Sequence, residues 1–141
     1  IDKLKRFRMY VYQNIIDGTE HLALVRGNIS EQKNTLVRMH SLNILSDLLD
    51  HKNKDLENAI EIISKLNHGV IVLIRNPRKE LLVREKKTTK SKKNILKEYG
   101  IGAQILIDLG VKKITLLTSS SKNIVGIDGF GIEINGTKKF S

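Results

Sequence analysis

The sequence predicts a single α/β (or α+β) domain with a mixed β-sheet and helices packed on its faces. Three stretches indicate this fold class. Lys97 to Ser120 reads as an amphipathic helix, a glycine turn and a short apolar strand, in the order that an α/β layer requires. Val70 to Ile74 is a continuous apolar run rich in β-branched residues, as expected for a strand covered on both faces. Phe7 to Val11 alternates well enough for a strand.

The first part of the chain is expected to form an antiparallel meander of three strands. These strands are the runs Phe7 to Val11, His21 to Arg26 and Leu36 to His40. Asp17-Gly18 is a turn signal between the first two strands. Gly27-Asn28 and the polar stretch Ser30 to Asn34 supply the second connection.

Two amphipathic helices are expected between this meander and the central strand at Val70 to Ile74. Leu42 to Leu49 has apolar residues at helical spacing. Leu56 to Leu66 repeats that spacing after a polar break, and Asn53 or Asp55 is the expected N-cap.

The last third of the chain is expected to add a helix and two short strands. Ile101 to Leu109 carries apolar residues four apart, and Gly110 follows where a helix C-terminus favours positive φ. Ile114 to Leu117 is the next strand and Ile132 to Ile134 the last, after which Asn135-Gly136 signals a turn.

The composition fits one soluble globular domain spanning residues 1–141. The 141 residues carry a formal net charge of +10, which favours anionic partners such as phosphates or nucleotides. There is no cysteine, which excludes disulfides and thiolate metal sites. Neither a long apolar membrane span nor a secretion signal is present in the sequence. The chain starts at Ile1 rather than Met, so we expect it to be a fragment of a longer protein.

The most basic segment of the chain is Arg84 to Lys93, which we interpret as an exposed loop. Its cations also allow a nucleic-acid contact. We favour the exposed loop, because isolated charge runs are usually solvated and only 4% of the residues are aromatic.

Several motifs resemble GTP cyclohydrolase II. They are YGIGAQIL, DLGV and LLT between Tyr99 and Thr118, the IVGIDGFG segment after them, and DGTEHLALVRGNI and TLVRMHS upstream. The resemblance extends from about Gly18 to Ile134. It is closest to the domain that follows dihydroxybutanone phosphate synthase in bifunctional riboflavin biosynthesis proteins.

The resemblance implies a zinc site that this chain has lost. The family holds one zinc ion with three cysteines, and the ion activates water. Asn43, Asp50 and Lys52 stand at those three positions. Their side chains do not make a zinc site, and none of the four histidines belongs to a substitute cluster. We therefore expect no zinc and no other cofactor in this domain.

The resemblance also implies that the catalytic pair has been replaced. Ile95 stands at the family's proton acceptor and Lys97 at its nucleophilic arginine. Isoleucine cannot accept a proton, and lysine lacks the fork geometry of guanidinium. We expect Ile95 to be a core contact and Lys97 to face solvent, so no catalytic residue is assigned.

A remnant of the family's nucleotide site is implied by Arg38, Thr118 and Lys122. The first two stand at nucleotide-contacting positions, and Lys122 is adjacent to a third. These residues could form a weak anion site with turn amides. Equally, they could be a strand arginine, a capping threonine and a surface lysine.

The resemblance and the substitutions together predict a degenerate, catalytically inactive GTP cyclohydrolase II-like domain. On this hypothesis it is the structural or dimerising partner of a dihydroxybutanone phosphate synthase domain in the same chain. We expect a homodimer in the cytoplasm, with no membrane or nucleic-acid partner. The alternatives are a nucleotide- or phosphate-sensing regulatory module, and an active hydrolase of GTP or a related nucleotide that uses Lys97 and Glu98.

Overall fold

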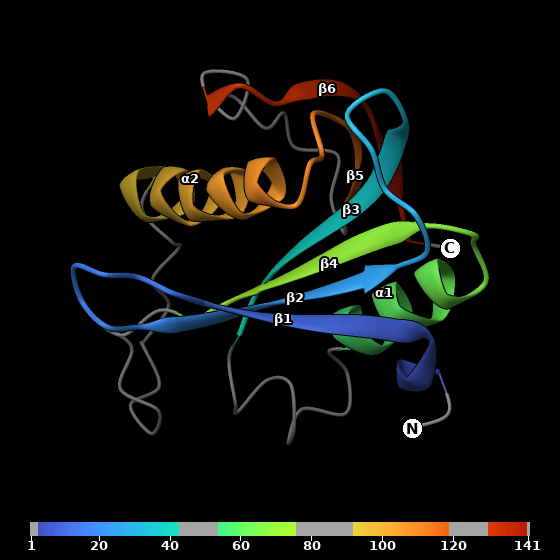
Figure 1. The fold of residues 1–141 in the computed structure, drawn as a ribbon, viewed down its shortest axis with the longest axis horizontal. Coiled ribbons are helices and arrows are strands. Elements are labelled where there is room, and N and C mark those ends of the chain that lie inside the picture. Colours follow the sequence, from blue (N-terminus) through green and yellow to red (C-terminus); the bar gives the residue numbers. More distant parts are fainter. Residues whose placement is uncertain (1–2, 43–53, 76–91, 119–129, 141) are drawn as a thin grey trace.

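The computed structural model describes residues 3–42, 54–75, 92–118 and 130–140 (Figure 1). Within these residues the elements in chain order are η1 (Leu4–Arg6), β1 (Phe7–Gln13), β2 (Glu20–Arg26), β3 (Asn34–Ser41), α1 (Asp55–Ser64), β4 (Gly69–Ile74), α2 (Lys92–Asp108), β5 (Lys113–Thr118) and β6 (Glu133–Lys139). The expected helix at Leu42 to Leu49 lies outside the described residues, apart from Leu42 itself.

The described strands form one mixed sheet in the order β1-β2-β4-β3-β5-β6. β1, β2 and β4 are joined in antiparallel fashion, whereas β3 pairs in parallel with both β4 and β5, and β5 pairs in parallel with β6. The mixed sheet confirms the predicted fold class.

The predicted three-strand meander is wrong at its third strand. β2 pairs with β4, so Leu24 faces Ile71, and β3 lies beyond β4 with Val37 opposite Val70. The chain leaves β3 and returns through α1 to a parallel neighbour, as a βαβ unit does. Alternation within a strand shows which residues share a face, but it does not identify the neighbouring strand.

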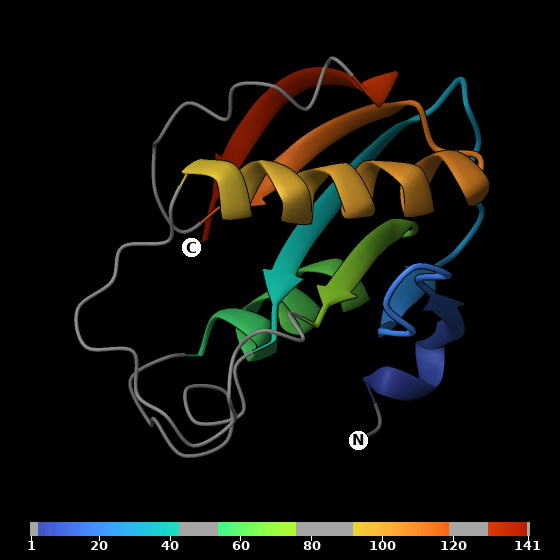
Figure 2. The ribbon, with the colours of Figure 1, turned by 90° about the vertical axis from the view of Figure 1, so that its left-hand side faces the viewer.

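Helices α1 and α2 cover opposite faces of the sheet (Figures 1 and 2). The α2-side core joins α2 to the sheet through residues that include Ala103, Leu106, Val37 and Leu116. The α1-side core joins α1 to the other face through residues that include Ala59, Ile63, Leu24, Ile71 and Leu117. Both faces of β4 are therefore covered, and all six of its residues are buried, as its apolar run predicted.

The helix ends confirm one prediction and correct two. Gly110 has φ +85° and follows α2 in a Schellman motif, in which Val111 N–H donates to Leu106 O over 2.9 Å. The N-cap of α1 is Lys54, without a side-chain cap, so Asp55 is the first helical residue rather than the cap. Asn53 lies outside the described residues. α2 begins at Lys92, so the last two residues of the predicted loop 84–93 are helical, while residues 84–91 lie outside the described residues.

The last strand is longer than its apolar residues predicted. β6 continues to Lys139, and the expected turn residues Asn135 and Gly136 lie within it. The register shifts there, since Ile114 pairs with Ile134 but Thr115 pairs with Gly136. Asn135 is thus the extra residue of a β-bulge. The Asn-Gly pair that signals a turn in a sequence is also compatible with such a bulge.

Among the described helices, none is long and apolar enough to cross a membrane.

Candidate functional site

The carboxyl ends of β3, β4 and β5 meet at one edge of the sheet, and this edge is the candidate site. Ser41 pairs with Ile74 where β3 and β4 end, and Thr118 is the last residue of β5. Because β2 runs antiparallel to β4, its first residues, including His21, reach the same edge. Open α/β sheets bind ligands at the carboxyl ends of their strands.

Arg38 lies on the α1 side of this edge. Its neighbours Val37 and Met39 belong to the α2-side core, so alternation directs Arg38 to the opposite face. Its Nη1 donates to the carbonyl of Leu117 over 3.2 Å, and its Nη2 lies 3.7 Å from Oδ2 of Asp55. Its guanidinium carbon lies 5.0 Å from the centroid of the Phe140 ring. The guanidinium is thus held by a carbonyl, a carboxylate and an aromatic ring.

Thr118 lies on the other face of the sheet. Leu117 belongs to the α1-side core and Leu116 to the α2-side core, so Thr118 points to the α2 side. Its side chain is buried, and its Oγ1 has no hydrogen-bond partner among the described residues. Arg38 and Thr118 therefore lie on neighbouring strands but on opposite faces. Lys122, the third residue of the expected anion site, is outside the described residues.

His21 is a buried polar residue of this edge that the sequence patterns did not single out. Its side chain is 3% exposed, and its Nδ1 accepts a hydrogen bond from the backbone N–H of Arg75 over 3.0 Å. The proton of the neutral ring is therefore on Nε2, which is buried without a partner among the described residues. Burial lowers the pKa of His21, and the Asp17 carboxylate opposes this shift only in part. The start of an apolar strand, HLALVR, was the available signal for a buried histidine.

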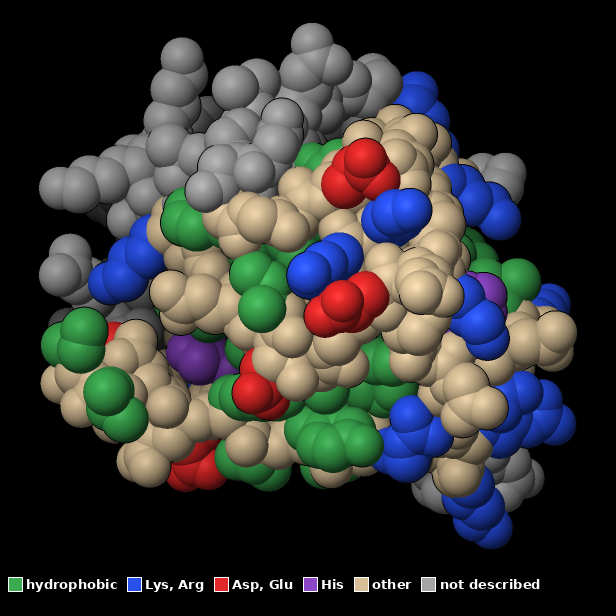
Figure 3. Space-filling model, turned by 45° about the horizontal axis from the view of Figure 1, so that its top comes forward, with side chains coloured by type: hydrophobic (Ala, Val, Ile, Leu, Met, Phe, Trp, Pro, Cys, Tyr) green, Lys and Arg blue, Asp and Glu red, His purple; other side chains and the backbone are tan. Residues whose placement is uncertain are grey.

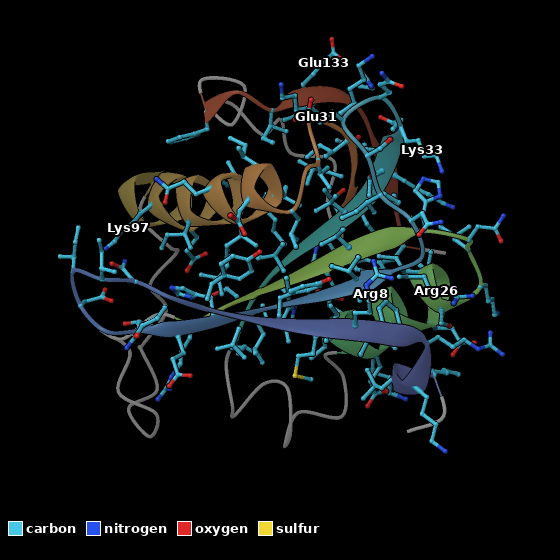
Figure 4. All side chains as sticks on the ribbon, in the orientation of Figure 1. Arg8, Arg26, Glu31, Lys33, Lys97 and Glu133 are labelled. Carbon is cyan, nitrogen blue, oxygen red and sulfur yellow. The ribbon has the colours of Figure 1, made fainter. Side chains whose placement is uncertain are left out.

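The helix α2 directs Lys97 and Glu98 to different surroundings. The hydroxyl of Ser41 donates to Oε1 of Glu98 over 3.0 Å, which ties the end of β3 to the helix. Lys97 is exposed at the end of α2 that faces the β1–β2 turn (Figure 4). Hydrogen bonds from Thr19 lower the pKa of Asp17 in that turn, and the charge of Lys97 adds to this effect. These contacts do not direct the two side chains to a common centre.

Tyr99, the next residue of α2, packs against the α2-side core. Burial raises the pKa of its phenol. The residue is thus held neutral and contributes mainly to packing.

The positions that correspond to the zinc cysteines are not part of the described structure. Asn43, Asp50 and Lys52 lie between α1 and β3 in the range 43–53, and the side chain of Ile95 is also outside the described set. Among the described residues, no group of three or more His, Cys, Asp and Glu side chains is arranged to hold a metal ion.

A family model for GTP cyclohydrolase II matches residues 2–139 of this chain. The chain is 33% identical over 143 residues to the monofunctional riboflavin biosynthesis protein RIBA 2, chloroplastic, of Arabidopsis thaliana, covering 92% of this chain and 30% of that protein. It is 35% identical to the riboflavin biosynthesis protein RibBA of Synechocystis sp., covering 91% of this chain and 27% of the relative. The RibBA protein of Aquifex aeolicus is also 35% identical, with 91% and 37% covered.

The chain therefore spans about a third of the length of these relatives. Among solved structures, the match to the structure of esterase Est22 with p-nitrophenol covers 79% of this chain and 34% of the esterase chain, with a TM-score of 0.43 and 14% identity. An overlap this weak carries no information about function.

Proposed function

The chain belongs to the GTP cyclohydrolase II family, and on this premise we propose that it is a degenerate domain of a riboflavin biosynthesis protein that does not hydrolyse GTP. The observation that carries the proposal is the absence of cysteine from all 141 residues, in a family whose resemblance implies a three-cysteine zinc site. Metal activation of water is worth several kcal/mol of transition-state stabilisation, so its loss cannot be offset by binding alone.

The residues at the implied zinc positions do not fit the metal. Asn43 offers a neutral amide, Lys52 a cation, and only Asp50 a charged oxygen ligand. Zinc sites in proteins are built from thiolate, imidazole and carboxylate ligands in a tetrahedral set. A single carboxylate beside an ammonium group does not provide this set.

The residues implied for acid/base chemistry are replaced as well. Ile95, at the implied proton acceptor, has no ionisable group. Lys97, at the implied nucleophile, is exposed, and Glu98 is hydrogen-bonded to Ser41. A general base must lie within hydrogen-bonding reach of the proton that it abstracts. Neither of the residues at these two positions is a base in such a location.

What remains is a scaffold, and we propose a structural role for it. The motifs from Tyr99 to Thr118 build α2, the Gly110 turn and β5, and these elements form much of the α2-side core. The resemblance implies a dihydroxybutanone phosphate synthase domain in the same chain, which would perform the chemistry of the parent protein. The domain would then be its structural or dimerising partner, in a cytoplasmic homodimer.

The test is an assay of the purified chain with GTP and added zinc. We expect formate release no faster than in a protein-free control. A matched rebuilt variant carries Asn43→Cys, Asp50→Cys, Lys52→Cys, Ile95→Asp and Lys97→Arg. Zinc uptake by this variant and not by the wild type would locate the loss at these positions. Zinc-dependent formate release by the wild type, at the rate of an active enzyme, would refute the proposal.

A second candidate function is a nucleotide- or phosphate-sensing module. Two buried polar atoms at the carboxyl edge support it, Nε2 of His21 and Oγ1 of Thr118, since neither has a partner among the described residues. Both are donors that an anion would accept from, and buried polar groups are ordinarily satisfied. Titration with GTP, GMP and pyrophosphate tests this candidate, because a ligand that binds the native state raises the melting temperature. No shift with any of the three would exclude it.

A further inference from the structure

Exposed apolar side chains are concentrated on one edge of the molecule. Eight large hydrophobic residues of the described structure are exposed, and six of them lie between residues 4 and 16: Leu4, Met9, Tyr10, Val11, Ile15 and Ile16. They belong to η1, β1 and the β1–β2 turn. Figure 3 shows exposed hydrophobic side chains at the end of the molecule where this turn lies. Apolar residues clustered in this way on a surface mark an interaction site more often than scattered ones do.

β1 is also an edge strand of unusual regularity. It pairs only with β2, and its seven residues pair in unbroken register from Phe7 opposite Arg26 to Gln13 opposite Glu20. It contains no proline or lysine, which proteins use to block edges. The opposite edge, β6, has a bulge and ends in Lys138 and Lys139. Only one edge of the described sheet is therefore protected against strand addition.

A hydrogen bond beside the turn shows which backbone groups of β1 are not bonded to β2. Asn14 N–H donates to Thr19 O over 2.8 Å, so this is a hydrogen-bonded pair of the hairpin. Hydrogen-bonded pairs alternate along an antiparallel ladder, so Tyr12, Tyr10 and Arg8 also bond to β2. Phe7, Met9, Val11 and Gln13 consequently direct their N–H and C=O groups to the free edge.

We propose that β1 pairs with β1 of a second copy, antiparallel about a two-fold axis at Tyr10, which joins two sheets into one. Tyr10 is the middle residue of Phe7–Gln13, so this register pairs the whole strand, and Phe7 meets Gln13 of the second copy. The outward-facing groups of Met9 meet those of Val11 of the second copy, as a hydrogen-bonded pair requires. A two-fold axis at Met9 or Val11 leaves one end of the strand unpaired.

The side chains suit this register. Met9 is 63% exposed and Val11 is 58% exposed. In this register Met9 of each copy lies beside Val11 of the other copy. Arg8 (Figure 4) lies on the other face of the strand, where its Nη2 donates to Gly27 O over 2.8 Å. In the proposed register it meets Tyr12 of the second copy, whose hydroxyl donates to the Asp108 carboxylate. The arginine gains an aromatic face and a nearby negative charge. The contact is thus complementary in both apolar surface and charge.

The charge distribution also favours contact between two copies at this edge over contact at their other surfaces. The chain carries a formal net charge of +10, so most surfaces of two copies repel each other. β1 contains one charged residue, Arg8, and the described turn adds Asp17. Two such edges can approach without opposing like charges in the proposed register.

The inference rests on the dimerising role proposed above and assigns it a surface. Val11→Lys places an ammonium group against Met9 of the second copy, and Ile107→Lys makes the same change on α2, where Ile107 is 43% exposed. In sedimentation velocity at micromolar concentrations we expect dimers of the wild type and of Ile107→Lys. Val11→Lys should raise the dissociation constant at least about tenfold.

The outcomes separate the two proposals. A monomeric wild type overturns both the dimerising role and the surface. A dimeric wild type with an unchanged Val11→Lys dimer overturns the surface alone. Circular dichroism and the melting temperature of each variant exclude unfolding as the cause of a monomer.

A cysteine variant tests the register, because the wild type has no cysteine. Tyr10→Cys places two thiols in a non-hydrogen-bonded pair, where Cα atoms lie about 4.5 Å apart, within the range of disulfides. We expect an oxidised, covalent dimer of Tyr10→Cys and none of Ile107→Cys. If both variants stay uncrosslinked while the wild type is dimeric, the two-fold axis is not at Tyr10.

Discussion

The hydroxyl of Tyr12 on β1 donates a hydrogen bond to Oδ2 of Asp108 in the last turn of α2, with 2.8 Å between the two oxygens. The bond ties the edge hairpin to a helix that is 96 residues away in sequence. Burial raises the pKa of Tyr12 well above its usual value, and the hydrogen bond and charge of Asp108 raise it further. The neutral phenol is therefore favoured in the folded state.

Tyr12→Phe should lower the free energy of unfolding by about 0.5–1.5 kcal/mol at neutral pH, the usual range for one hydrogen bond. The wild-type contribution has a predictable pH dependence. It is complete below the unfolded pKa of about 10 and is lost as pH rises toward the higher folded pKa. Urea unfolding at neutral and alkaline pH should show a steeper alkaline loss for wild type than for Tyr12→Phe. Equal alkaline losses in the two proteins would show that Tyr12 does not cause the pH dependence.

The elements that the sequence predicted well are those determined by local rules. Gly110 ends a helix because positive φ is needed there, and the apolar run of β4 reports burial on both faces. The pairing of β3 was missed because it depends on where the chain returns after α1. Asn135-Gly136 was misassigned because the same residues fit a turn and a bulge.

The candidate site was predictable in position but not in orientation. The carboxyl end of β5 followed from the strand prediction, and Thr118 lies there. That Arg38 points to the other face depends on the register between β3 and β5, in which Val37 pairs with Leu116. His21 was missed because a lone histidine has no spacing signal, and its partner is the backbone N–H of Arg75, the residue that follows β4.

Gly27→Ala should be far more damaging than Gly18→Ala, although both glycines have positive φ, +69° and +73°. A Cβ on Gly27 would clash with the carbonyl oxygen of Asn67, whereas a Cβ on Gly18 would meet nothing within 4 Å. We expect Gly18→Ala to cost about 1–2 kcal/mol from backbone strain alone. Gly27→Ala should cost at least about 3 kcal/mol, because a backbone atom cannot rotate away. Equal losses in urea unfolding would show that strain, not the clash, dominates at Gly27.

His21→Gln should remove an acid-dependent loss of stability. Burial lowers the pKa of His21 in the folded state, so the unfolded chain binds the proton first as pH falls below about 6.5. The free energy of unfolding of the wild type should therefore fall across this range. Glutamine can still accept the Arg75 N–H bond but does not titrate, so His21→Gln should fall less steeply. An equally steep fall in both proteins would show that another group causes the loss.

Arg38→Lys tests which contact of Arg38 matters most to the fold. Lysine keeps the charge but cannot direct one nitrogen to Leu117 O and another to Asp55 while it lies against Phe140. The arginine side chain is 14% exposed and the Asp55 side chain 33% exposed, at a separation of 3.7 Å. The ion pair is therefore partly screened, and Asp55→Asn should cost no more than about 1 kcal/mol.

The carbonyl of Leu117 lies at the junction of β3 and β5, and it loses a charged donor in Arg38→Lys. A hydrogen bond to a charged group contributes about 1.5–3 kcal/mol, so Arg38→Lys should lower the free energy of unfolding by that amount. Phe140→Leu, which keeps an apolar contact but removes the ring, should cost about 0.5–1 kcal/mol. Urea unfolding of the three variants orders the contacts. A loss in Asp55→Asn as large as that in Arg38→Lys would assign the stabilisation to the ion pair instead.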